Sequence, residues 1–423
     1  MTLPIETAAR RQLPLGMPPA KFLRDYWQKR PLLIRGAFPG FRDPLTPNDL
    51  AGLACEESAL SRLVVHDPRG DRWTLRNGPF SETDFGKLSK RDWTLLVQDV
   101  DKWDADVGTL LEHFSFLPAW RIDDVMVSYA VDRGSVGAHV DNYDVFLLQG
   151  LGQRRWRIST DPKARTAFRS DAELKLLREF APTHEWLLES GDMLYLPPSV
   201  PHHGVAVGEC LTYSIGMRAP SRGDLMIDFA ETFAETIPEE LRFGDVDLLP
   251  ADGDGEIDEA AMRRVFQAMP WLKLGGDLAG GDGKRVGATK KRVGNFDSCS
   301  GEVDSLQLRT WFGRFITRYR SAHAAAPRSR KIGDSAFATA LARHARAMRN
   351  PWSRAAWMDF GRDARLFVAG DDFACSRAFA RRVCGAAPLA LDAIKSTRDR
   401  DILRALIDAG HFTLIEPPRR SRA

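Results

Sequence analysis

The feature that most constrains how this chain can fold is a pair of short motifs far apart in the sequence. His139-Val140-Asp141 is the first, and His202, preceded by Pro201, lies 61 residues beyond the aspartate. Side chains two positions apart on a β-strand point to the same face of a sheet. His139 and Asp141 can therefore share one face, and a later strand returning to that place would bring His202 beside them.

Two imidazoles and one carboxylate that converge in this way form a known type of metal site. They occupy one face of an octahedral ion and leave the other face open, as in non-haem Fe(II) oxygenases. The triplet alone is weak evidence, because a chain of this length and composition contains a His-x-Asp by chance roughly half of the time. The alternative is a surface histidine beside a solvated aspartate, so the surrounding sequence has to decide.

The surrounding sequence predicts an antiparallel β-barrel. An apolar strand is expected over residues 141–150, ending in a Gly-x-Gly turn, and residues 154–159 alternate long polar with apolar side chains, as a half-buried strand does. Gly191-Asp192 predicts a tight turn inside 185–198. The remaining segments predicted as strands of the same barrel are 204–207 and 210–217.

These segments resemble a known enzyme family. HVDNYDVFLLQGLGQRRWRI, GDMLYLPPSVPHHG, YSIGMRAP and the N-terminal FLRDYWQKRPLLIRGAF are similar to the JmjC-type cupin oxygenases, most specifically to the bacterial ribosomal oxygenases of the RoxA type. The resemblance extends over about residues 15 to 220. It implies an α+β protein: a double-stranded β-helix (a JmjC-type cupin jelly roll), then an α-helical dimerisation region and a C-terminal winged-helix-like domain.

Three domains are expected on this basis. Residues 1–220 would form the catalytic cupin with an N-terminal helical segment, 221–302 a helical dimerisation region, and 303–423 the winged-helix-like domain. In the second region, apolar residues recur near helical spacing and must be buried against something; they are Leu225, Ile227, Phe229, Phe233 and Ile237. In the family that something is a second subunit, which implies a homodimer; packing within the chain is the alternative.

The stretch 275–302 is read as a Gly- and Lys-rich insertion. Glycine at this density resists regular structure, so a linker is expected there. Its basic residues are open to two interpretations, contact with ribosomal RNA or a solvated loop. Beyond it, amphipathic helices are expected at 303–324 and 334–349. A short strand at 365–370, helices at 376–383 and 401–409, and a closing strand at 411–416 complete the domain.

Composition places limits on the class of protein. Hydrophobic residues make up 43% and charged residues 28% of the 423 residues, and there is no apolar run long enough for a membrane span. The N-terminus lacks the blocks of a signal peptide. The five cysteines form no CxxC, which favours a reducing cytoplasm over a disulfide framework. The net charge of +3 is too small to indicate a general polyanion binder.

The resemblance assigns the metal ligands. It implies that His139, Asp141 and His202 hold Fe(II), with 2-oxoglutarate and O2 as co-substrates. His203 is the local competitor of His202, and adjacent strand residues face opposite sides, so only one of the two can enter the barrel. The spacing of the PPSVPHHG motif against the family favours His202.

A 2-oxoglutarate molecule also needs a cation for its distal carboxylate, preferably a forked guanidinium. Arg154, Arg155 and Arg157 are the candidates. Alternation gives Arg154 one face, together with Trp156, and gives the other two arginines the opposite face. The arginine of the family aligns with Arg154, which is therefore the expected co-substrate ligand. Hydroxyl groups near it could come from three residues: Ser128, Thr212 and Ser214.

The implied activity is Fe(II)/2-oxoglutarate-dependent protein hydroxylation, at the β-carbon of an arginine in large-subunit ribosomal protein sixteen. A JmjC hydroxylase or demethylase acting on another protein is the nearest alternative. A metabolite-processing cupin and a non-catalytic cupin regulator that binds DNA through its winged helix are more distant ones. The first would lack 2-oxoglutarate turnover, and the second would bind duplex DNA even without its metal ligands.

A guanidinium substrate would need carboxylates and an aromatic wall at the pocket mouth. Six residues near the motifs are candidates without individual assignment: Asp123, Asp124, Tyr129, Asp132, Tyr143 and Asp144. The expected partners are a ribosomal protein of the large subunit and a second copy of the chain. Neither a membrane nor direct binding to DNA is expected.

Overall fold

The computed structural model describes residues 4–10, 13–246, 259–268, 305–319, 325–343 and 345–415. The chain divides into two compact units, one formed by residues 1–220 with 316–423 and the other by residues 221–315. The whole stretch 275–302, which was interpreted as an insertion, lies outside the described residues. Among the described helices, none is both long and apolar enough to cross a membrane.

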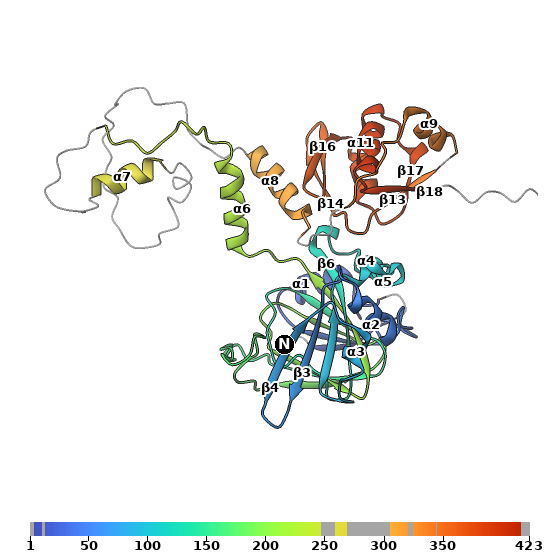
Figure 1. Cartoon of the computed structure of the whole chain (residues 1–423), viewed down its shortest axis with the longest axis vertical. Helices are drawn as coiled ribbons and strands as arrows, with labels where there is room; N and C mark the ends of the chain where they lie inside the picture. Colours follow the sequence, from blue (N-terminus) through green and yellow to red (C-terminus); the bar gives the residue numbers. More distant parts are fainter. Residues whose placement is uncertain are drawn as a thin grey trace, which may run out of the picture. The chain divides into compact units, whose positions relative to one another are not determined.

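A nine-stranded sheet forms the frame of the N-terminal domain (Figure 1). All neighbouring strands are antiparallel except the first pair, which is parallel. In spatial order the strands are β1 (Glu6–Ala8), β2 (Leu32–Arg35), β10 (Met193–Leu196), β7 (Val145–Gln149), β12 (Cys210–Met217), β6 (Ile122–Ala130), β5 (Trp93–Val97), β3 (Ser61–Asp67) and β4 (Arg72–Asn77).

A second, three-stranded sheet packs on one face of this frame. Its order is β11 (His202–Val207), β8 (Gln153–Ile158) and β9 (His184–Leu188). Leu194 and Leu196 of β10 point toward it and share a buried cluster with Trp156 and Ile158 of β8. Two sheets packed face to face over an apolar layer make the jelly roll of a cupin, and the strands of the smaller sheet carry His202 and Arg154.

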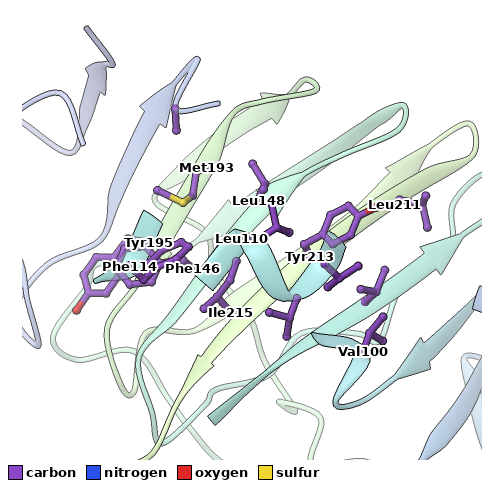
Figure 2. Close-up of a cluster of buried hydrophobic side chains, with 14 of the residues drawn as sticks. Val100, Leu110, Phe114, Phe146, Leu148, Met193, Tyr195, Leu211, Tyr213 and Ile215 are labelled. Carbon is purple, nitrogen blue, oxygen red and sulfur yellow. The ribbon is translucent and has the colours of Figure 1, made fainter. Parts of the chain in front are cut away.

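The opposite face of the large sheet is covered by helices and the N-terminal segment. Because side chains alternate along a strand, Met193 and Tyr195 point away from the small sheet and into this second core. Figure 2 shows both residues beside Phe114 and Phe146, whose rings lie 4.9 Å apart. The helices of this domain are α1 (Pro19–Asp25), α2 (Pro47–Cys55), α3 (Glu82–Phe85), α4 (Val100–Trp103) and α5 (Ala105–Thr109). Burial on both faces explains why β7 and β10 read as unbroken apolar runs.

The second unit contains α6 (Arg222–Ala234), α7 (Glu259–Ala268) and most of α8 (Ser305–Thr317). A capping box begins α6, in which Ser221 and Asp224 each accept the other's backbone N–H. The indole N–H of Trp311 donates to Asp228 at 2.8 Å, and the ring of Trp311 meets Phe229 edge-on. No residue of α6 is buried despite its apolar stripe.

The C-terminal domain mixes helices with two small sheets around one core. Its elements are α9 (Asp334–Ala342), β13 (Arg346–Arg349), β14 (Ala355–Phe360), β15 (Asp363–Val368), β16 (Asp371–Cys375), α10 (Arg377–Cys384), β17 (Leu389–Ala390), α11 (Thr397–Asp408) and β18 (Phe412–Ile415). The helix expected over 334–349 is wrong in its second half, because residues 346–349 pair with both β17 and β18. Tertiary pairing that buries Ala347 overrides the helical propensity of the segment.

Candidate metal centre and its pocket

The structure brings His139, Asp141 and His202 together. The backbones of His139 and His202 exchange two N–H···O bonds of 3.0 Å, so His139, which precedes β7 in the sequence, lies beside the first residue of β11. Their rings are 4.2 Å apart between centroids. Nε2 of His139 lies 4.0 Å and Nε2 of His202 3.6 Å from the Asp141 carboxylate. One potential ligand atom from each residue lies within 4.8 Å of the others, a spacing that a single metal ion can bridge.

Both histidines are oriented by backbone carbonyl groups. Nδ1 of His139 lies 3.0 Å from the carbonyl oxygen of Gly137, and Nδ1 of His202 lies 2.9 Å from that of Val200. A carbonyl can only accept, so each Nδ1 carries the proton and each Nε2 keeps its lone pair. Fixing the tautomer and the ring in this way is the usual arrangement around metal-binding histidines.

Burial keeps His202, the third candidate ligand, in the form that a metal needs. His202 is 2% exposed, and burial together with the neighbouring His139 lowers its pKa to about 4. The imidazole of His202 is therefore neutral at physiological pH even when no metal ion is bound. His203 points away from this cluster, where its ring meets Phe180, so the two adjacent histidines are divided by strand alternation.

Arg154 is a buried cation without a carboxylate partner among the described residues. It is 3% exposed, and its Nη1 lies 3.2 Å from Ser128 Oγ and 3.4 Å from Thr212 Oγ1. Its Nε has no hydrogen-bond partner. Burial lowers the pKa of this guanidinium. An uncompensated buried charge costs several kcal/mol, so the side chain is suited to receive an anion from outside the chain.

Trp156 connects this cation to the metal-binding side chains. The guanidinium carbon of Arg154 lies 5.1 Å from the Trp156 ring, and that ring lies 5.9 Å from the ring of His202. Gly204 leaves room for this arrangement, because a Cβ there would lie 2.7 Å from Trp156 and 2.8 Å from Arg154 Nε. Trp156 thus lies between Arg154 and His202 along the paired strands β8 and β11.

The side chains of the other two arginines of β8 lie on the outer surface of the small sheet. Arg155 donates to Glu185 at 2.7 Å and Arg157 donates to the same carboxylate at 2.6 Å. These side chains are about two-fifths exposed and paired, as exposed arginines usually are. The alternation along β8 thus separates Arg154 from its neighbours, and Ser128 and Thr212 are the hydroxyl groups that it contacts.

Of the six candidates for the pocket mouth, Tyr143 lies beside a metal-binding candidate, because its hydroxyl is hydrogen-bonded to Asp141, and Asp124 lies close enough to Tyr143 to affect its pKa. Burial of the Tyr143 hydroxyl, followed by the nearby carboxylates of Asp141 and Asp124, raises the pKa of this tyrosine. Asp124 is 8% exposed, and burial next to Asp99 raises its pKa to about 6. It accepts the backbone N–H of Asp99 at 3.2 Å. Lys102, which pairs with Asp99 and Asp101, offsets part of this effect, and a bound guanidinium would offset more of it.

The other four candidates have contacts within the fold. Asp123 pairs with Arg354 of the C-terminal domain at 2.5 Å. Asp144 is fully buried and accepts from three residues, Tyr195, Gln28 and Arg121. Asp132 accepts the backbone N–H of Gly208, and Tyr129 packs edge-on against Trp93. These contacts account for the positions of the four residues without a role in substrate binding.

Some residues of the site could not have been found from sequence patterns. The carbonyl groups of Gly137 and Val200 act through the backbone, so no side-chain type signals them. Gly204 directly follows His202 and His203, so its position in the sequence marks it as a candidate. The reason for a glycine there is visible only in the structure, where Arg154 and Trp156 surround it.

Fold and site together define the class of protein: a JmjC-type cupin with a two-histidine, one-carboxylate metal centre. Residues 109–225, which contain all three metal-binding candidates, match the JmjC domain family, and residues 303–413 match the ROXA-like winged helix. The chain belongs to the ribosomal oxygenase family that combines these two domains.

Similar proteins support this membership. The chain is 37% identical over 258 residues to the ribosomal protein uL16 3-hydroxylase of Escherichia coli, covering 61% of this chain and 67% of the relative. It is 39% identical to a probable ribosomal oxygenase of Haemophilus influenzae, over 56% of this chain and 58% of that protein's length. The structure of YcfD from Escherichia coli superposes with a TM-score of 0.75 at 30% identity, covering 94% of this chain and 98% of the other. The same protein has been solved with cobalt and 2-oxoglutarate, with a TM-score of 0.72 at 28% identity to this chain.

Proposed function

We propose that this protein is an Fe(II)- and 2-oxoglutarate-dependent hydroxylase of protein side chains. The observation that carries the proposal is the buried, unpaired Arg154 on the same face as His139, Asp141 and His202. A metal alone would explain the three ligands but not the cation. A metal with a bound dicarboxylate explains both, and the complex of the Escherichia coli relative with cobalt and 2-oxoglutarate supports it.

Each residue has a defined part in this scheme. His139, Asp141 and His202 would hold the ferrous ion through Nε2 and carboxylate atoms, with the carbonyls of Gly137 and Val200 fixing both rings. Iron with 2-oxoglutarate and oxygen supplies the oxidising power that replaces a C–H by a C–OH. Arg154 binds the distal carboxylate of the co-substrate, with Ser128 and Thr212 fixing the guanidinium plane. Burial around these groups keeps water from the reacting centre.

The proposed substrate is a large-subunit ribosomal protein, and the proposed position is the β-carbon of an arginine in protein sixteen. The Escherichia coli relative is named a ribosomal protein uL16 3-hydroxylase, which supports this choice. The chemistry of the pocket mouth agrees with it. Asp124 would pair with the guanidinium of the substrate, and Tyr143 would pack against its aliphatic stem beside Asp141.

The activity can be tested by anaerobic reconstitution with Fe(II) and 2-oxoglutarate, followed by exposure to air with recombinant uL16. We expect succinate formation coupled to a mass gain of about 16 Da, one oxygen atom, on an arginine peptide. The variant His202→Ala is the matched negative control. Absence of 2-oxoglutarate turnover in a wild-type protein that binds metal and co-substrate would contradict the proposal. Turnover with another protein, or loss of a methyl group, would move the assignment to another JmjC activity.

We also propose that the protein works as a homodimer in the cytoplasm. The support for a dimer is α6, an amphipathic helix in which Met226 is 71% and Ile227 61% exposed. An apolar helix face of this kind is expected to be covered by a partner. A ribosomal protein substrate, as in the Escherichia coli relative, supports the compartment.

A further inference from the structure

The C-terminal domain is the most positively charged part of the described chain. Residues 325–415 contain sixteen Lys and Arg against nine Asp and Glu, an excess greater than the +3 of the whole protein. The rest of the sequence is therefore net acidic. Charge separated in this way sets up a local field that favours polyanions near the domain, even though the overall charge is small.

Part of this charge is concentrated in one place, which we call the basic cluster: Arg381, Arg382, Lys395 and Arg400. Arg382 of α10 donates to the carbonyl of Ala393 at 2.6 Å, and Arg400 of α11 donates to that of Ile394 at 2.8 Å. Lys395 is the next residue along this loop. Two guanidinium groups are thus held by the two residues directly before Lys395. Arg381, Arg382 and Lys395 are exposed, and Arg400 is half-buried.

The basic cluster is not neutralised within the described residues. None of its four members has a carboxylate within ion-pair distance there, whereas arginines elsewhere in the same domain do. Arg398 of α11 pairs with Asp363, and Arg404 of α11 pairs with Asp334. Cations left unpaired side by side repel one another and gain free energy when phosphate groups lie between them.

The arrangement differs from that of a winged helix that reads duplex DNA. Such domains place the second helix of a helix-turn-helix pair in the major groove and contact base edges from it. In this domain the helix that comes directly before the closing strand β18 is α11 (Figure 1). Its outward arginines Arg398 and Arg404 are already held by acids, so they are poor donors to base edges. The unpaired charge lies on α10, on the loop before α11 and on Arg400 near the start of α11 instead.

An aromatic side chain adds a second recognition element. The guanidinium of Arg381 lies over the ring of Trp357 in β14, 5.3 Å from its centroid. A stacked guanidinium keeps its plane and its outward N–H groups, which suits contact with phosphates and with unstacked bases. Exposed, unpaired bases occur in folded RNA far more than in duplex DNA.

We propose that the basic cluster binds the phosphate backbone of RNA. The choice of RNA rests on the proposed function, because a ribosomal protein substrate is presented beside ribosomal RNA. The cluster would hold the enzyme near its substrate while the metal centre acts on the side chain. Its members are not part of the catalytic machinery, so their removal should leave hydroxylation of the free protein intact.

The experiment measures fluorescence anisotropy of a labelled ribosomal RNA hairpin with the full-length protein, and the binding variant is Arg381→Gln/Arg382→Gln/Lys395→Gln. The control removes the same charge from the same domain through Arg328→Gln/Arg330→Gln/Lys331→Gln. Arg328 donates its backbone N–H to the Asp408 carbonyl, at the C-terminal end of α11, whereas Lys395 precedes the N-terminal end. Both variants lose three positive charges, one variant near each end of α11. A difference between their RNA affinities would therefore indicate a defined binding site, and equal affinities would indicate general electrostatic attraction.

Three lost phosphate contacts should weaken RNA binding roughly 100-fold at about 0.1 M salt and lower the slope of log K against log salt by about 2. The control variant should bind within about threefold of wild type, as expected for charge remote from the site. No RNA binding by wild type, equal losses in both variants, or tighter binding to duplex DNA of the same length would each overturn the proposal. Because this readout needs neither metal nor co-substrate, it succeeds or fails independently of the hydroxylase assay.

Discussion

Replacing Arg154 with methionine would test the central feature of the site. The substitution keeps most of the volume of the side chain in its buried place and removes only the charge and the donors. Because the guanidinium has no carboxylate partner among the described residues, its removal breaks no ion pair with any of them. The effect on folding and the effect on co-substrate binding should therefore have opposite signs.

The magnitudes follow from the contacts. A guanidinium holding a carboxylate makes two charge-assisted hydrogen bonds, each worth about 1.5–3 kcal/mol. Their loss amounts to about 3–6 kcal/mol, or a roughly 150- to 20,000-fold higher Kd for 2-oxoglutarate. Replacing a buried charge by an apolar side chain of similar size is neutral or stabilising, by up to about 4 kcal/mol. The free energy of unfolding without ligands should thus stay equal or rise.

Both quantities can be measured on one sample of protein. Isothermal titration with 2-oxoglutarate in the presence of Mn(II) gives the affinity, and denaturant unfolding without ligands gives the stability. Arg155→Met is the matched control, since Arg155 is adjacent on β8 but pairs with Glu185 at the surface, where a pair contributes about 1 kcal/mol or less. Unchanged affinity in Arg154→Met, or a large loss in Arg155→Met, would refute the assignment. A strongly destabilised Arg154→Met would show that the charge has a partner in the folded protein.

Three further predictions concern the metal, the substrate and the dimer. His202→Ala should lower Co(II) affinity by more than the roughly 10- to 100-fold typical of lost supporting contacts, and His203→Ala should not; equal effects would contradict the division of the two rings. Asp124→Asn should lower kcat/KM for uL16 by about 10- to 100-fold, the loss of one hydrogen bond between charges, with 2-oxoglutarate affinity unchanged; unaltered kcat/KM would remove Asp124 from the substrate site. Met226→Asp with Ile227→Asp should halve the mass seen by light scattering, and a wild-type protein that is already monomeric would rule out the dimer.

The sequence predicted the local geometry of the N-terminal domain well. Alternation along residues 153–158 already divided the three arginines between two faces, because the two-residue period of a strand is a local property. The cupin and the winged-helix-like domain were both expected and are both present. The prediction of a helix over residues 346–349 is wrong. These residues form a strand because they pair with β17 and β18, which come 40 and more residues later in the sequence.

The pocket could be anticipated only in part. The six candidate residues of its mouth were indistinguishable by position in the sequence. The fold separates Asp144, which is buried among Tyr195 and Gln28, from Asp124, which has one backbone donor and a raised pKa. Partners of this kind come from distant segments, so no local pattern reports them.

The sequence by itself determined the chemistry of this protein: which donor atoms are available, and which side of each strand carries them. Spacing of two residues is enough for that, because it follows from the geometry of a single extended chain. Only the tertiary structure decided that His202 stands against His139, that carbonyl groups fix both rings, and that no acid meets Arg154 within the described fold. Those relations depend on how two sheets bury their shared apolar layer, and that packing involves residues from the whole domain at once.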